Sequence, residues 1–284
     1  MLSVLHVTIS AVRPILRSLA VALVAIAVFG GCGDDDGTGA SGSFTPRTDD
    51  TLTVATGFPS AGFWEGTDVD HVTGGFEYEL AQALADRFGL EKLKVVDVPF
   101  DELVAGKAKG FDLALAQVSV TAKRAKVVDL SESYLTTPVG VVSREGLDIP
   151  DLAKAREQRW GMAKATTEVD VVKDLVRPDA EVRVYRRTAD ALAGVVNREI
   201  DVAALDYVRA FAEVAEGQGL EVAAQITAPQ NYAALLPKGS SNLEAIDSAI
   251  RALKRDGTLD ELTDDLYDQF DVDANAVPTI RVTP

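Results

Sequence analysis

The sequence predicts an α/β fold, because strand-like and helix-like segments alternate along the chain from residue 52 onward. Regular alternation of this kind is typical of parallel sheets covered by helices on both faces. The segment 112–118 is nearly all apolar, as expected for a buried parallel strand. Leu80, Leu84 and Phe88 recur along one helical face, which predicts an amphipathic helix over 77–88.

The remaining elements follow the same pattern. Further strands are expected at 52–56, 94–98, 139–143, 159–162, 181–185, 201–205 and 232–236. Further helices are expected at 168–175, 188–197 and 206–216. Near the C-terminus, Asn242 is expected to cap a helix that ends at Gly257, and Thr258–Glu261 has the pattern of a capping box that starts another.

The N-terminal segment 1–31 is typical of an export signal. Arg13 and Arg17 precede an apolar run, 19–29, that is about half the ~20 residues a membrane-spanning helix needs. Small residues then precede Cys32, the single cysteine of the chain. This end resembles the lipobox of bacterial lipoproteins, which implies that Cys32 carries acyl chains such as palmitate and anchors the protein outside the cell membrane. The alternative is a plain cleaved signal followed by an incidental cysteine.

The segment 32–50 is expected to be a flexible tether, because its first part is polar, rich in glycine and free of bulky side chains. At the other end, the segment 272–284 is expected to be a tail and carries no recognisable motif. The folded part, about 51–284, is long enough for one large domain or two small lobes.

The composition argues against several functions. The chain has 28 basic and 44 acidic residues and a formal net charge of −16, which disfavours binding to nucleic acids or anionic membranes. Of its two histidines, His6 lies in the signal and His71 alone remains. A serine–histidine–aspartate triad or a histidine-rich metal site is therefore not expected, and neither is a cofactor.

Three segments together resemble one protein family. They are Gly75–Leu80, with a glycine before an acidic helical turn; Asp112–Arg124, a buried strand followed by a polar turn; and Asp129–Tyr134. They are similar to the family 3 solute-binding proteins, the polar amino-acid receptors of ABC importers. The resemblance implies the two-lobed fold of type II periplasmic binding proteins, with two crossings between the lobes. Lobe 1 would comprise 51–137 plus 230–271, and lobe 2 would comprise 138–229.

The resemblance also implies how the ligand is held. In the family, the arginine that matches Arg124 clamps the ligand α-carboxylate, and a guanidinium suits this task because it bonds a carboxylate bidentately. Gln117, Ser119 and Thr121 precede it and are expected beside the ligand. Taken alone, Arg124 would also fit a surface residue on a helical turn.

The second half of the family pattern supplies the other side of the ligand. Thr167 matches a threonine whose backbone N–H binds the same carboxylate, although it would also serve as a helix cap. Asp206 matches the acidic residue that pairs with the ligand α-ammonium, and it could equally be an N-cap. Arg124 and Asp206 together would form the two halves of a site for a zwitterion.

The side chain of the ligand is less defined. Lys164 matches a lysine of glutamine-binding members, and Gly57 stands where binders of basic amino acids carry an acidic residue. The resemblance therefore favours glutamine, glutamate or asparagine. Phe63 and Trp64 are expected to form an apolar wall, with the core of the lobe as the alternative for each.

The expected function is capture of an amino acid by a monomeric, lipid-anchored receptor that delivers it to an ABC permease and its ATPase. Catalysis is not expected. Two alternatives are a stand-alone receptor that reports an amino acid to a sensor protein, and an enzyme similar to the cyclohexadienyl dehydratases that share this fold.

Overall fold

The computed structural model describes residues 43–214, 219–270 and 277–283. Within these ranges, nine strands form one sheet in the order β4-β1-β5-β10-β6-β9-β7-β8, with β11 beside β10. Its strands are β1 (Thr51–Thr56), β4 (Lys92–Asp97), β5 (Leu113–Ala114), β6 (Val128–Arg144), β7 (Trp160–Ala163), β8 (Arg183–Tyr185), β9 (Val202–Asp206), β10 (Leu220–Pro237) and β11 (Thr279–Ile280). A separate hairpin pairs β2 (Glu65–Gly66) with β3 (Val72–Gly74).

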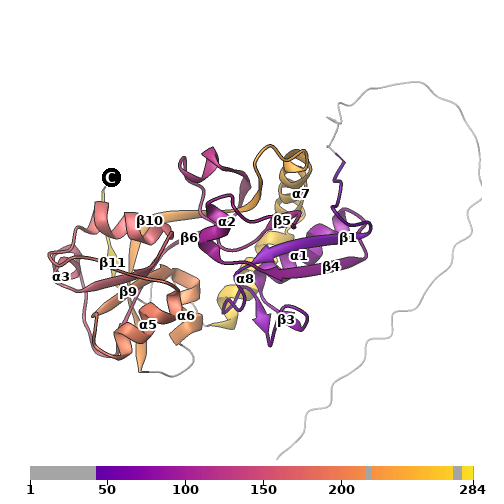
Figure 1. Ribbon diagram of the computed structural model, residues 1–284. Helices are drawn as coiled ribbons and strands as arrows, with labels where there is room; N and C mark the ends of the chain where they lie inside the picture. The colour runs from indigo at the N-terminus through magenta and orange to yellow at the C-terminus, as the bar shows by residue number, and fades with distance from the viewer. Residues whose placement is uncertain (1–42, 215–218, 271–276, 284) are drawn as a thin grey trace, which may run out of the picture. The chain divides into compact units, whose positions relative to one another are not determined.

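The strands β6 and β10 are the two long elements that join the halves of the sheet (Figure 1). They pair antiparallel to each other along most of their lengths. On one side, which we call the first half, β1 pairs parallel with β4 and β5. On the other side, the second half, β7 pairs parallel with β8 and β9. Each half is thus a mostly parallel α/β unit, and hydrogen bonding continues between them through the long strands.

The helices divide in the same way. They are α1 (Phe76–Arg87), α2 (Phe100–Val104), α3 (Leu152–Arg156), α4 (Thr167–Val171), α5 (Thr188–Val196), α6 (Tyr207–Val214), α7 (Leu243–Arg255) and α8 (Thr258–Gln269). In the first half, a hydrophobic cluster joins β1 to α1, α7 and α8. In the second half, a separate cluster packs around Trp160, Val202 and Ile226. None of the described helices is both long and apolar enough to cross a membrane.

One predicted strand is much shorter in the structure. Of 112–118, only Leu113–Ala114 is strand, although its residues are buried as expected. Further along, Gln117 adopts a left-handed conformation with φ of 50°, so the strand could not extend through it. This break turns the chain toward the polar segment that contains Arg124.

The predicted helix caps near the C-terminus are also different. The side chain of Asn242 does not cap α7; its amide instead exchanges two hydrogen bonds with the backbone of Thr45, at 3.0 and 2.9 Å. The residue at the N-cap of α8 is Gly257 rather than Thr258, whose hydroxyl donates to Asp256 at 2.7 Å. In both cases a neighbouring polar group competes for the side chain that the local pattern assigned to the cap.

Both ends of the described chain are more ordered than the sequence predicts. Phe44 lies in the segment expected to be tether, yet its ring stacks on Phe88 at 4.3 Å. In the expected tail, β11 pairs parallel with β10 and buries Ile280 completely. The signal segment 1–31, Cys32 and the tether through residue 42 lie outside the described residues.

Candidate functional site

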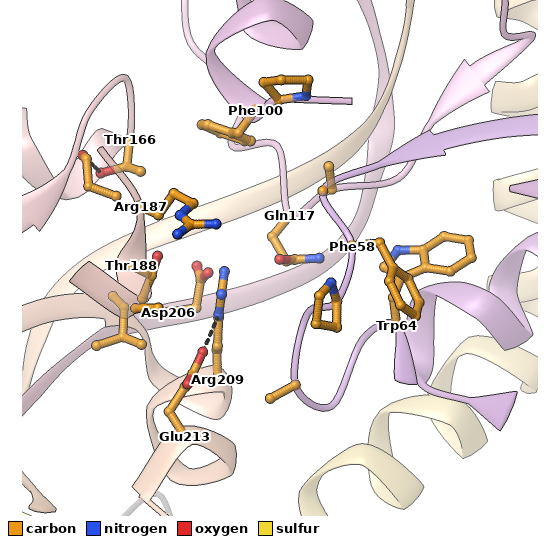
Figure 2. A pocket seen from close by; sticks show the side chains of 18 of the residues that line it. Phe58, Trp64, Phe100, Gln117, Thr166, Arg187, Thr188, Asp206, Arg209 and Glu213 are labelled. Carbon is orange, nitrogen blue, oxygen red and sulfur yellow. Dashed lines mark hydrogen bonds and ion pairs between the residues drawn. The ribbon is translucent and has the colours of Figure 1, made fainter. Parts of the chain in front are cut away.

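A cleft with a volume of about 1160 Å³ lies between the two halves. The first half contributes residues of 57–66, 97–102 and 116–124, and the second half contributes residues of 163–168, 186–189 and 204–213. Figure 2 shows Phe58, Phe100 and Gln117 across from Arg187, Asp206 and Arg209. The volume is slightly above the range of about 300–1,000 Å³ for ligand pockets, so a small solute fits with water around it.

Arg124 lies at the base of this cleft with its guanidinium held in place. Nη1 donates to the carbonyl of Ser119 at 2.7 Å, and Nη2 donates across the cleft to the carbonyl of Ala165 at 3.0 Å. The guanidinium also lies 5.3 Å from the ring centre of Phe100, within the range of a cation–π contact. Arg124 is therefore a buried cleft residue and not the exposed surface residue that its local sequence also allowed.

Two carboxyl groups of the second half face the same cleft. Asp206 ends β9, directly before α6, and Glu168 lies in the first turn of α4. Burial raises the pKa of Asp206 well above its usual range, and the nearby charge of Glu168 raises it further. Burial likewise raises the pKa of Glu168, while Arg124 and Arg209 oppose that rise. Both carboxyls line the cleft, so a cation that enters it would meet them.

Polar contacts already join the two halves beside Arg124. The hydroxyls of Ser119 and Thr167 lie 3.1 Å apart, and Thr167 donates to the amide oxygen of Gln230 at 2.6 Å. Thr167 is the first residue of α4, and Thr166 occupies the cap position, so Thr167 is not the cap of this helix.

Lys164 extends from the second half toward the first. Its Nζ lies 2.9 Å from a carboxylate oxygen of Asp101. The hydrogen bond from Lys164 lowers the pKa of Asp101. Lys164 therefore lines the cleft, but its ammonium group forms an ion pair with Asp101 in this structure.

The buried carboxyl of Glu77 positions Gln117. The sequence pattern places Glu77 in the acidic first turn of a helix. Glu77 is completely buried, and its two oxygens accept from Trp64 Nε1 at 2.8 Å, from the backbone N–H of Gln117 at 2.8 Å, from Gln117 Nε2 and from the hydroxyl of Tyr134. Burial raises the pKa of Glu77, and these hydrogen bonds oppose the rise. The carboxyl thus fixes the backbone and side chain of Gln117 at the cleft wall.

Glu77→Ala is expected to destabilise the fold by about 3 kcal/mol or more, since it leaves a buried N–H of Gln117 and a buried hydroxyl of Tyr134 without partners. The free energy of unfolding in urea measures the loss. Glu77→Gln is the matched control for side-chain size. It is also expected to destabilise, because its amide N–H groups would face the donors of Trp64 and Gln117. Wild-type stability of both variants would contradict this role.

Two of the residues expected at the ligand, Phe63 and Thr121, do not line the cleft. Phe63 does not line the cleft; it is completely buried and packs edge-on to Phe76 at 6.1 Å. Trp64 does line the cleft as predicted, but it has no exposed surface, and its indole N–H donates inward to Glu77 and to the carbonyl of Leu115. Thr121 is not among the lining residues, and its hydroxyl accepts from the backbone N–H of Arg124 at 3.1 Å. Thr121 therefore supports the turn that carries Arg124.

Several lining residues were not predicted from the sequence, among them Glu168, Phe100 and Arg209. Glu168 and Phe100 stand in segments without a distinctive pattern, and only the fold brings them to Arg124. Arg209 could have been found from its spacing. It follows Asp206 by one helical turn and precedes Glu213 by another, so the three side chains share a helix face. No cluster of residues suited to a metal ion occurs in the described part of the chain.

Comparison with known proteins places the chain in a family. The model of the bacterial extracellular solute-binding proteins, family 3, matches residues 52–269. The "Amino-acid-binding protein AabA" of Dichelobacter nodosus is 29% identical over 202 residues, which cover 68% of this chain and 79% of the relative. A relative of another kind, "Membrane-bound lytic murein transglycosylase F" of Pseudomonas fluorescens (strain Pf0-1), is 27% identical over 208 residues, which cover 70% of this chain but 43% of that protein.

A solved structure agrees with the fold. "An ancestral arginine-binding protein bound to glutamine" superposes with a TM-score of 0.67 at 26% identity, over 78% of this chain and 99% of that one. The two-lobed α/β fold predicted from the sequence is therefore confirmed. Because the family model spans nearly all of the folded part, the chain belongs to the bacterial extracellular solute-binding proteins, family 3.

Proposed function

We propose that this chain is the lipid-anchored substrate-binding protein of an ABC importer and that it captures an amino acid by closing its two lobes. The observation that carries the proposal is the arrangement of Arg124 opposite Asp206 and Glu168 in one cleft. A guanidinium suits the α-carboxylate of an amino acid, and two buried carboxyls suit its α-ammonium.

The proposed lobes are 51–137 with 230–271, and 138–229. Their boundary is supported by the pairing of β6 with β10, which is irregular between Ile226 and Gln230. Irregular pairing at the crossing leaves the strands free to bend, as a hinge requires. Arg124 would then belong to lobe 1 and Asp206 to lobe 2, so that only a closed state brings both onto one ligand. Closure would present the loaded protein to a membrane permease and its ATPase.

The proposed ligand is glutamine, glutamate or asparagine. Gly57 lines the cleft without a carboxylate that would attract a basic side chain. The solved ancestral arginine-binding protein bound to glutamine supports a ligand of this size. Lys164 says less about the side chain of the ligand than the sequence indicates, because its ammonium group is paired with Asp101.

The test is a thermal-shift screen of the mature protein, freed of bound ligand, against the twenty amino acids. A ligand at about 100 times its Kd stabilises the folded state by roughly 2.7 kcal/mol, which raises the melting temperature by several degrees. A rise with one or more amino acids supports the proposal. If no amino acid raises the melting temperature, the chain does not bind this class of ligand.

The lipid anchor has its own prediction. Cys32→Ser is expected to release the protein from the membrane fraction, because two acyl chains are needed for stable anchoring and the variant cannot be acylated. Immunoblots of membrane and soluble fractions measure the change, with wild type as the control. If the variant stays in the membrane fraction, another element anchors the protein.

A further inference from the structure

We propose that Arg209 forms a second cationic subsite in the cleft, which binds the side-chain carboxylate of a dicarboxylic amino acid and disfavours basic side chains. This inference rests on the proposed function and narrows its ligand class. It would make glutamate the preferred ligand.

The first observation is the position of the Arg209 guanidinium. Arg209 lines the cleft from α6, one turn after Asp206. Figure 2 shows its side chain next to that of Asp206, with the guanidinium directed into the space between the halves. The side chain is 21% exposed, so its charge is largely enclosed by protein and cleft.

The second observation is which of its donors are used. Nε of Arg209 donates to Glu213 at 3.2 Å, an i,i+4 pair on the same helix. Within the described chain, Nη1 and Nη2 have no hydrogen-bond partner. Glu213 therefore orients the guanidinium and leaves its outer edge, the edge that can bond a carboxylate, for a ligand.

The third observation is the relation of Arg209 to the ammonium site. Its charge lowers the pKa of both Asp206 and Glu168, so it acts within the same small volume as these carboxyls. In aspartate and glutamate, the ammonium and the distal carboxylate are joined by a short aliphatic chain. Such a ligand can place its ammonium at Asp206, its α-carboxylate at Arg124 and its distal carboxylate at Arg209.

The other cations of the cleft do not offer the same subsite. Lys164 is paired with Asp101, and Arg186 is exposed. The side chain of Arg187 is 67% exposed and lies 3.8 Å from Asp190. A basic ligand side chain near the Arg209 guanidinium would meet a like charge in a partly enclosed site, which costs binding free energy. Arg209 therefore selects among amino acids by attraction of one class and repulsion of another.

The experiment is calorimetric titration of the mature protein with glutamate, glutamine and arginine, repeated with Arg209→Met. Wild type is expected to bind glutamate most tightly. Arg209→Met is expected to weaken glutamate binding by about tenfold or more, to weaken glutamine binding less, and to improve arginine binding relative to glutamate. Arg251→Met is the matched control: it removes an arginine paired with Glu132 and Glu244, outside the cleft, and is expected to leave all three affinities unchanged.

Glu213→Gln separates charge from positioning. It keeps an oxygen that can accept from Nε but removes the competing negative charge, so glutamate binding is expected to hold or tighten. Wild type that binds arginine as tightly as glutamate would overturn the inference, as would an equal loss of glutamate and glutamine binding in Arg209→Met. If glutamine and arginine bind and glutamate does not, the inference fails while the proposed function stands. If no amino acid binds, both fail.

Discussion

Arg124→Ala is expected to weaken amino-acid binding by about 30-fold or more, because it removes the buried partner of the ligand α-carboxylate. Within its own lobe, the guanidinium donates to the carbonyl of Ser119, which orients it before the ligand arrives. Calorimetric titration with the tightest amino acid from the thermal-shift screen measures the loss.

Arg124→Lys is the matched variant, since it keeps the positive charge but loses the planar pair of donors. It is expected to retain part of the affinity. The melting temperature of the ligand-free Arg124→Ala protein is expected to stay within a few degrees of wild type. Normal affinity in a well-folded Arg124→Ala protein would show that the α-carboxylate binds elsewhere.

Amino-acid affinity is expected to fall as the pH is lowered from neutral, and Asp206 is the expected origin of the effect. Burial and the charge of Glu168 raise the pKa of Asp206, Arg209 lowers it, and Glu77 raises it. A ligand ammonium binds the ionised carboxyl. Protonation of Asp206, as the pH falls through its raised pKa, therefore competes with ligand and weakens binding.

Asp206→Asn is expected to weaken binding by about 30-fold or more at neutral pH and to flatten its dependence on pH. The Kd measured across acidic and neutral pH, for wild type and variant, tests both statements. Other groups near this carboxyl also titrate or carry charge: Glu77, Tyr134, Glu168, Arg124, Arg209 and Glu213. Glu168→Gln therefore serves as a comparison and is expected to make the pH dependence shallower without removing it. A pH dependence that is unchanged in Asp206→Asn would contradict this assignment.

Much of the fold could be predicted because local sequence patterns and tertiary structure agree in most segments. The apolar periodicity of 77–88 predicts α1 closely, since the same face that is apolar in the sequence packs on β1. The pattern fails where a side chain finds a distant partner. Asn242 bonds to Thr45, almost 200 residues away in sequence, and local rules for helix caps cannot anticipate that competition.

The candidate site was likewise predicted only in part from the sequence. The sequence pattern was enough to name Arg124, Asp206, Ser119 and Thr167, and the fold brings these residues to one cleft. It was not enough to separate Phe63 from the cleft wall, because an apolar side chain next to a loop fits either position. Nor did it reveal that Glu77 positions Gln117, since their hydrogen bonds span 40 residues.

We propose that an amino acid bound between Arg124 and Asp206 holds the two lobes closed. Small-angle X-ray scattering of the mature Cys32→Ser protein, with and without a saturating amino acid, measures closure as a fall in the radius of gyration. We expect this fall for the wild-type cleft and its absence in Arg124→Ala at the same ligand concentration. A radius of gyration that stays constant when calorimetry shows the cleft to be saturated would contradict capture by closure.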